Sequence, residues 1–70
     1  MYNNDDIQGM INDVNKDNTA AKILAHINEY DRDAVREVLR SGNYETFERY
    51  DSAVCEQFIR AYEDEYCLPF

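Results

Sequence analysis

Apolar residues recur every three or four positions along most of the chain, which is the period of an amphipathic helix. The first apolar stripe consists of Ile7, Met10, Ile11 and Val14. Asn3 or Asn4 stands where a helix needs a cap, and Asp5 and Asp6 suit the positive N-terminal end of a helix. The pattern therefore predicts a first helix that carries this stripe.

Two further stripes follow a polar break at residues 15–19. They consist of Ala20, Ile23, Leu24, Ile27 and Tyr30, and then of Ala34, Val35, Val38 and Leu39. The residues placed to cap these two helices are Asp17, Asn18 or Thr19 for the former and Asp31 or Asp33 for the latter. We expect the latter helix to end at Gly42, because glycine readily adopts the left-handed conformation that terminates helices.

The last two stripes are rich in aromatic residues. Tyr44, Phe47 and Tyr50 predict a short helix. A final helix, capped by Asp51 or Ser52, carries the stripe Val54, Cys55, Phe58, Ile59, Tyr62 and Tyr66. Leu68 and Phe70 are expected to cover the end of the core beyond it.

No stretch shows the strict apolar–polar alternation or the Asn-Gly turn that marks a β-hairpin. Short amphipathic helices are not stable alone, so the five stripes must share one core. The sequence therefore predicts an all-α fold, a compact bundle of four to five short helices. With 70 residues, we expect a single acidic helical domain spanning residues 1–70.

The net charge limits the kinds of partner. The chain has 15 acidic residues against 7 Lys and Arg, a net charge of −8. Phosphate backbones are bound by Lys and Arg side chains that displace counterions, so this chain should not bind nucleic acid directly. It should also be repelled by anionic membrane surfaces. We expect a basic protein as its partner.

The sequence also favours a cytoplasmic location. No apolar run approaches the roughly 18 residues of a membrane span, and the acidic N-terminal segment does not resemble a signal peptide. If one helix held both Cys55 and Cys67, about 18 Å would separate them, too far for a disulfide. Reduced thiols agree with the cytosol.

One segment partly matches a calcium-binding loop of the EF-hand type. Asp13, Asn15 and Asp17 stand at the first, third and fifth positions of such a loop, and Asn18 replaces its glycine. Leu24 stands where the loop needs its bidentate glutamate. A polar loop between two helices explains the segment better, so we predict no metal and no cofactor.

Catalytic chemistry has little support either. His26 is the only histidine and forms with Glu29 an H-x-x-E pair, whereas a catalytic zinc needs three protein ligands. A nucleophile at Cys55 is unfavourable, because the residue belongs to an apolar stripe and burial makes a thiol inert. No Gly-rich phosphate loop is present. We therefore predict that the protein is not an enzyme.

Acids and tyrosines together indicate a contact surface in the C-terminal half. Tyrosine is enriched at protein interfaces, and carboxylates four residues apart on a helix lie about 6 Å apart, similar to phosphates along a nucleic-acid strand. Three acids at the end of the last helix also oppose its macrodipole. The predicted contact residues are Glu45, Glu48, Asp51, Glu56, Tyr62, Glu63, Asp64, Glu65 and Tyr66.

In size, charge and helicity, the chain resembles the small acidic inhibitors of phages and mobile elements, including nucleic-acid mimics. That resemblance implies a non-enzymatic inhibitor that occupies a basic site on a nucleic-acid-handling protein, such as a nuclease, a restriction or CRISPR effector, or a polymerase factor. The alternative is a helical adaptor or assembly module. Such a module would bind a partner, or a second copy as a homodimer, through a Tyr-rich apolar patch.

Overall fold

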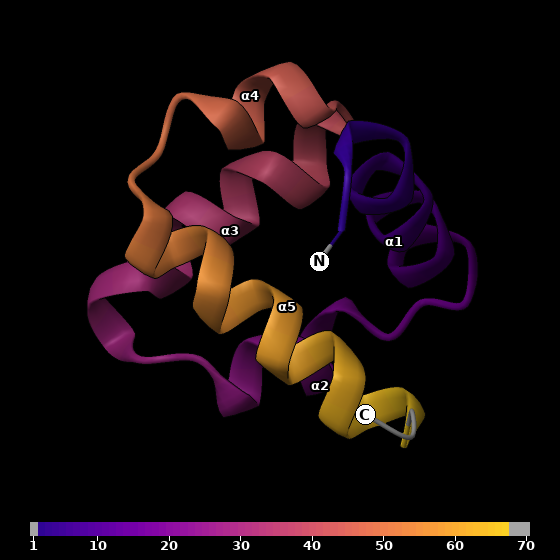
Figure 1. The fold of residues 1–70 in the computed structure, drawn as a ribbon. Helices are drawn as coiled ribbons and strands as arrows, with labels where there is room; N and C mark the ends of the chain where they lie inside the picture. Colours follow the sequence, from indigo (N-terminus) through magenta and orange to yellow (C-terminus); the bar gives the residue numbers. More distant parts are fainter. Residues whose placement is uncertain (1, 68–70) are drawn as a thin grey trace.

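The computed structural model describes residues 2–67 (Figure 1). This part of the chain contains five α-helices, joined by short turns, and no strand. The helices are α1 (Asn4–Lys16), α2 (Ala20–His26), α3 (Glu29–Ser41), α4 (Tyr44–Glu48) and α5 (Ser52–Tyr66). This arrangement confirms the predicted all-α bundle of four to five short helices. The predicted positions of Leu68 and Phe70 lie outside the described residues.

Helix α3 lies at the centre of the bundle, because it packs against each of the other four helices. Helix α5 crosses the front of the view in Figure 1, and α2 packs against it. The radius of gyration, 10.6 Å, is close to the value of about 11 Å expected for a compact chain of this length. The short connections therefore bring all five apolar stripes together around one core.

Side-chain caps begin four of the five helices, and those of α1 and α5 are at predicted residues. Asn3 and Asp6 form a capping box at the start of α1, and Asp51 accepts a hydrogen bond from Val54 N at the start of α5. Gly42 ends α3 with φ 67°, in the left-handed region as predicted. Thr19 occupies the cap position of α2, but its hydroxyl is bonded elsewhere and does not cap the helix.

The boundary between α2 and α3 differs from the prediction. Helix α2 ends at His26, and Asn28 caps α3 by accepting a hydrogen bond from Tyr30 N at 3.0 Å, in place of Asp31 or Asp33. Tyr30 therefore belongs to the first turn of α3 and is 93% exposed, whereas the apolar pattern placed it inside. Local hydrogen bonding by Asn28 thus overrides helical periodicity at this corner.

The core consists of one cluster of apolar side chains from all five helices. The rings of Phe47 and Phe58 are both fully buried and meet edge to face at 5.2 Å. Gln8 ties α1 to the turn between α3 and α4, because it donates to Gly42 O at 2.8 Å and accepts from Tyr44 N at 2.7 Å. No charged side chain is buried among residues 2–67, so every described charge is available to solvent or to a surface pair.

Candidate functional site

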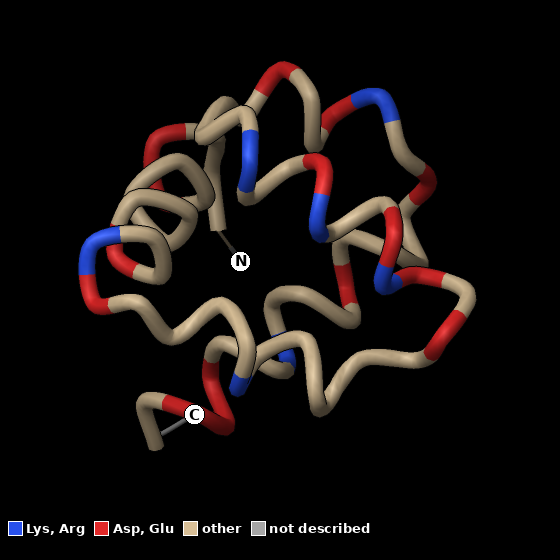
Figure 2. Tube along the Cα trace, turned by 180° about the vertical axis from the view of Figure 1, so that it is seen from behind, with Lys and Arg blue, Asp and Glu red and all other residues tan. Residues whose placement is uncertain are grey.

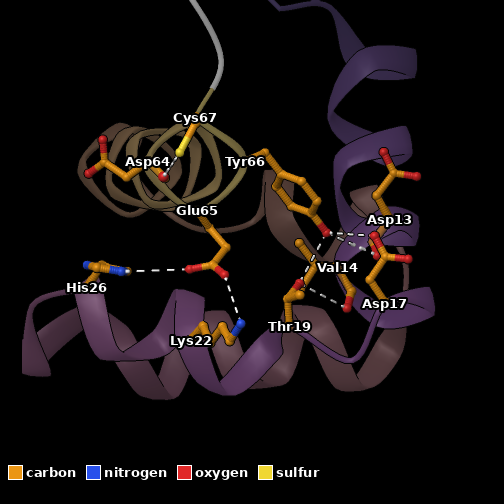
Figure 3. A network of polar contacts seen from close by, with 10 residues as sticks. All are labelled: Asp13, Val14, Asp17, Thr19, Lys22, His26, Asp64, Glu65, Tyr66 and Cys67. Carbon is orange, nitrogen blue, oxygen red and sulfur yellow. Dashed lines mark hydrogen bonds and ion pairs between the residues drawn. The ribbon is translucent and has the colours of Figure 1, made fainter.

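Side chains at the end of α5 contact residues of α1 and α2 (Figure 3). Tyr62 is only 9% exposed and lies in the core, while Tyr66 is half-buried with its ring centre 4.6 Å from that of Tyr62. The Tyr62 hydroxyl donates to the Asp13 carboxylate at 3.2 Å, and the Tyr66 hydroxyl donates to that of Asp17 at 3.0 Å. The tyrosines of this predicted contact segment thus bridge two helices, and Tyr62 leaves little surface for a partner.

Thr19 completes the bridge at the start of α2. Its hydroxyl lies 3.2 Å from that of Tyr66 and 3.5 Å from Val14 O (Figure 3). These bonds explain why Thr19 does not cap its own helix. They fix the polar loop between α1 and α2, in which Asn18 adopts a left-handed φ of 58° that asparagine tolerates.

Glu65 points toward α2, in contrast to its exposed neighbour Asp64. Its side chain is 18% exposed and lies 3.5 Å from Lys22 Nζ and 3.9 Å from His26 Nε2, both on α2 (Figure 3). The positive charge of Lys22 offsets the unfavourable position of an acid at a helix C-terminus. The acid at position 65 is therefore explained by its contacts with α2, although its position at a helix C-terminus is unfavourable.

Glu63 and Asp64 differ from Glu65 and from each other. Glu63 is half-buried and faces the hydroxyl of Tyr2. Asp64 is exposed, and its backbone oxygen accepts a contact from Cys67 Sγ at 3.6 Å (Figure 3). The Asp64 carboxylate is therefore the acid of this segment that solvent reaches most freely.

Carboxylates of α1 join those of α5 around the three tyrosines. Asp13 and Asp17 accept the tyrosine hydrogen bonds described above, and Asp6 adds negative charge beside Tyr2. We name this surface the acid–tyrosine face and define it as Tyr2, Asp6, Asp13, Asp17, Tyr62, Glu63 and Tyr66. The α1 acids and Tyr2 were not among the predicted contact residues. The spacing of Asp6, Asp13 and Asp17, which places them along one side of a helix, is the signal that could have found them.

The pKa values of the tyrosines report the environment of this face. Desolvation, followed by the hydrogen bond to Asp13 and its charge, raises the pKa of Tyr62 to about 12. Desolvation also raises the pKa of Tyr66, with a contribution from Asp17, and that of Tyr2, with contributions from Glu63 and Asp6. Partial burial beside carboxylates thus keeps the three hydroxyls protonated, and those of Tyr62 and Tyr66 donate hydrogen bonds to Asp13 and Asp17.

The remaining predicted contact residues lie away from this face. Glu45 and Glu48 are exposed on α4, and Asp51 caps α5. Glu56 forms a surface ion pair with Arg60 at 2.7 Å. The acids are spread over α1, α3, α4 and α5 and the turns beside them, as the red segments of Figure 2 show. The predicted contact residues therefore do not form one continuous surface.

Most acids lack a basic neighbour. All 15 acidic residues lie in the described part of the chain. Four of them, Asp33, Glu37, Glu56 and Glu65, have an oxygen between 2.7 and 3.9 Å from a basic nitrogen. The remaining eleven form no ion pair within residues 2–67, so the negative charge of the molecule is largely uncompensated at its surface.

The polar segment that partly matches a calcium loop has a different geometry. Helix α1 continues through Lys16, so Asp13 and Asn15 are helical, and Asp17 caps the C-terminus of the helix. Within residues 2–67, no three His, Cys, Asp or Glu side chains are grouped so that they could hold a metal ion. The acids of this segment instead accept the hydrogen bonds of Tyr62 and Tyr66.

The groups considered for catalysis are also engaged elsewhere. His26 and Glu29 lie on different helices, and His26 faces Glu65. Burial, with an added effect of the Asp51 charge, raises the pKa of the Cys55 thiol, which disfavours the reactive thiolate. Cys67 is an exposed free thiol whose Sγ lies 3.6 Å from the backbone oxygen of Asp64. A shallow depression lined by His26, Gln57, Arg60, Ala61 and Asp64 has a polar lining.

Residues 2–67 contain no helix both long enough and apolar enough to cross a membrane. Comparison of the chain with known protein families, with curated proteins and with solved structures found no match in any of the three.

Proposed function

We propose that the protein is a non-enzymatic acidic inhibitor that occupies a basic nucleic-acid-binding site on a partner protein. It would act as a nucleic-acid mimic of the kind used by phages and mobile elements against nucleases, restriction enzymes or CRISPR effectors. The cytoplasm, where such partners and reduced thiols are found, is its proposed location.

The observation that carries this proposal is the large number of surface acids that have no basic neighbour. Eleven of the 15 acids have no basic neighbour in residues 2–67, and all four acids of the acid–tyrosine face are among them. A surface with this charge attracts basic proteins and accelerates their association.

The spacing of the carboxylates supports the same conclusion. Asp13 and Asp17 are four residues apart on α1, or about 6 Å, and Asp6 is about 10 Å further along the helix. Lys and Arg side chains arranged to bind successive phosphates can meet carboxylates at such distances. The hydrogen bonds from Tyr62 and Tyr66 hold two of these carboxylates in place, which lowers the entropy cost of binding.

The direct test is capture of the partner from the source cell at low salt, followed by competition with the partner's nucleic acid. We expect a basic protein whose binding weakens steeply as salt rises and whose nucleic acid is displaced. Capture of no basic protein, or undisturbed nucleic-acid occupancy of the captured partner, would refute the proposal.

Charge reversal then identifies the surface. Asp17→Lys with Glu63→Lys reverses two acids of the acid–tyrosine face, and Glu45→Lys with Glu48→Lys on α4 is the control with an equal change in net charge. We expect a large loss of affinity for the first pair and a small loss for the second. Equal losses would mean that net charge alone drives binding and that the face is wrongly assigned. Glu65 is left unchanged because it holds Lys22.

One observation favours the alternative, an adaptor or assembly module. Tyr30 is 93% exposed, while the other five tyrosines are buried or half-buried. A partner that needs Tyr30, and that tolerates both charge reversals, would support this second function.

A further inference from the structure

Helix α3 has an exposed side on which charges of both signs alternate. Tyr30 is 93% exposed and the Asp33 side chain 92%, and Arg36 and Arg40 are exposed as well. Asp33, Arg36, Glu37 and Arg40 together line a shallow depression. Figure 2 shows the alternation as red and blue segments along the helix. We name Tyr30, Asp33, Arg36, Glu37 and Arg40 the α3 face.

The charges on this face are ordered so that two copies of the helix, placed antiparallel, are complementary to each other. Read from the N-terminal end it is acid, base, acid, base, at Asp33, Arg36, Glu37 and Arg40. Read from the C-terminal end it is base, acid, base, acid. An antiparallel second α3 would therefore place an opposite charge against each of the four. The midpoint lies between Arg36 and Glu37.

We propose that the α3 face binds the α3 face of a second copy of this chain about a twofold axis through that midpoint. Asp33 then meets Arg40 of the second copy, and the symmetry repeats the pair about 10 Å away along the helix. Arg36 meets Glu37 of the second copy. The Tyr30 ring covers the turn after α3 of the second copy, near Asn43.

The pairs made by Asp33 and Arg40 carry most of this proposal. Within residues 2–67, Asp33 has one ion-pair partner, Arg36 at 3.5 Å, and Arg40 has none. Glu37 is already occupied, because it lies 3.6 Å from Arg49 and accepts a hydrogen bond from the Tyr50 hydroxyl. Two exposed ion pairs related by symmetry, with an aromatic ring at each end, fit a weak dimer.

The charge of the whole molecule also favours this face. Two chains that each carry −8 repel one another, so they approach best where basic residues are concentrated. Helix α3 carries three of the seven Lys and Arg residues, Arg32, Arg36 and Arg40, against four acids, which leaves it a net charge of only −1, and Arg49 lies beside Glu37. The acid–tyrosine face, on α1 and α5, remains free for a different partner.

The test is sedimentation equilibrium at low salt over a protein concentration series that reaches the millimolar range. We expect the wild-type chain to dimerise. Asp33→Arg and Arg40→Asp should each weaken the dimer roughly tenfold or more, because each change creates two like-charge contacts by symmetry. Asp64→Arg is the control for the first, since it alters net charge equally at an exposed position on α5.

Mixing the two single variants gives the decisive result. Every Asp33 and Arg40 contact then joins opposite charges again, so the mixture should form a heterodimer, and the double variant should dimerise like the wild type. A monomeric wild type throughout the series overturns the proposal, and so does a dimer that both single variants leave unchanged. Neither result affects the test of the proposed inhibitor, which uses the acid–tyrosine face.

Discussion

The Tyr66 hydroxyl donates a hydrogen bond to the Asp17 carboxylate at 3.0 Å and thereby joins the last turn of α5 to the end of α1. The neighbouring Tyr62 makes the matching bond to Asp13 at 3.2 Å. Asp13 and Asp17 therefore stabilise the fold, and they also supply negative charge that a basic partner can contact. Any test of function on this surface must therefore be read beside its effect on folding.

Removal of either hydroxyl should cost stability. Tyr62→Phe and Tyr66→Phe each delete a hydrogen bond to a carboxylate, and we expect a loss of about 1–2 kcal/mol in the free energy of unfolding. Urea denaturation followed by circular dichroism measures it. Tyr30→Phe is the matched control, because the hydroxyl of its exposed ring forms no hydrogen bond within residues 2–67, and it should leave stability unchanged.

A double-mutant cycle on Tyr62→Phe and Asp13→Ala separates the bond from its surroundings. We expect the two losses to be non-additive by about 0.5–1.5 kcal/mol, since the residues share one interaction. Strictly additive losses would show that the bond contributes nothing to stability.

Stability should fall at alkaline pH. The folded protein raises the pKa of Tyr62 from its ordinary value of 10.0 to about 12, so the folded state retains a proton that the unfolded state has lost. The contribution of Tyr62 is therefore complete below about pH 10 and disappears as the pH rises through about 12. Unfolding free energies across this range should decline less steeply in Tyr62→Phe. An identical slope in the variant would contradict the assignment.

The spacing of apolar residues predicted which segments are helical better than it predicted where each helix begins and ends. The stripes of α1, α3 and α5 required only the spacing of apolar residues, and Gly42 ends its helix by backbone conformation alone. Tyr30 was misplaced because it continues the period of α2 across a break. That break depends on the cap by Asn28. The backbone N–H of Asn28 also donates a hydrogen bond to Gln57 Oε1 on α5 at 2.7 Å, a contact that no local sequence pattern reveals.

The candidate site was less predictable than the fold for a related reason. Asp13 and Asp17 show half of a known loop motif, yet their partners are tyrosines some fifty residues further along the chain. Glu65 looked like an unfavourable charge because its neighbours Lys22 and His26 belong to α2. Sequence spacing reports neighbours on one helix, whereas these contacts depend on how helices pack.

The Glu65 contacts allow a swap experiment. Glu65→Lys places a positive charge beside Lys22 and His26 at a part-buried position, and we expect a loss of roughly 1 kcal/mol or more. Lys22→Glu combined with Glu65→Lys should recover part of that loss, because the pair is restored in reverse. Thermal denaturation at low and high salt measures both. A double variant no more stable than Glu65→Lys alone would argue against pairing with Lys22.

The two glycines should respond in opposite directions to the same substitution. Gly42 has φ 67°, where a side chain is strained, so Gly42→Ala should destabilise the protein by about 1 kcal/mol. Gly9 lies within α1 with no atom within 4 Å of an added methyl group, so Gly9→Ala should stabilise it by about 0.5–1 kcal/mol. Each variant is the other's control for the loss of a glycine from the unfolded chain. Changes of the same sign, measured by urea denaturation, would show that backbone conformation at Gly42 is not what requires glycine there.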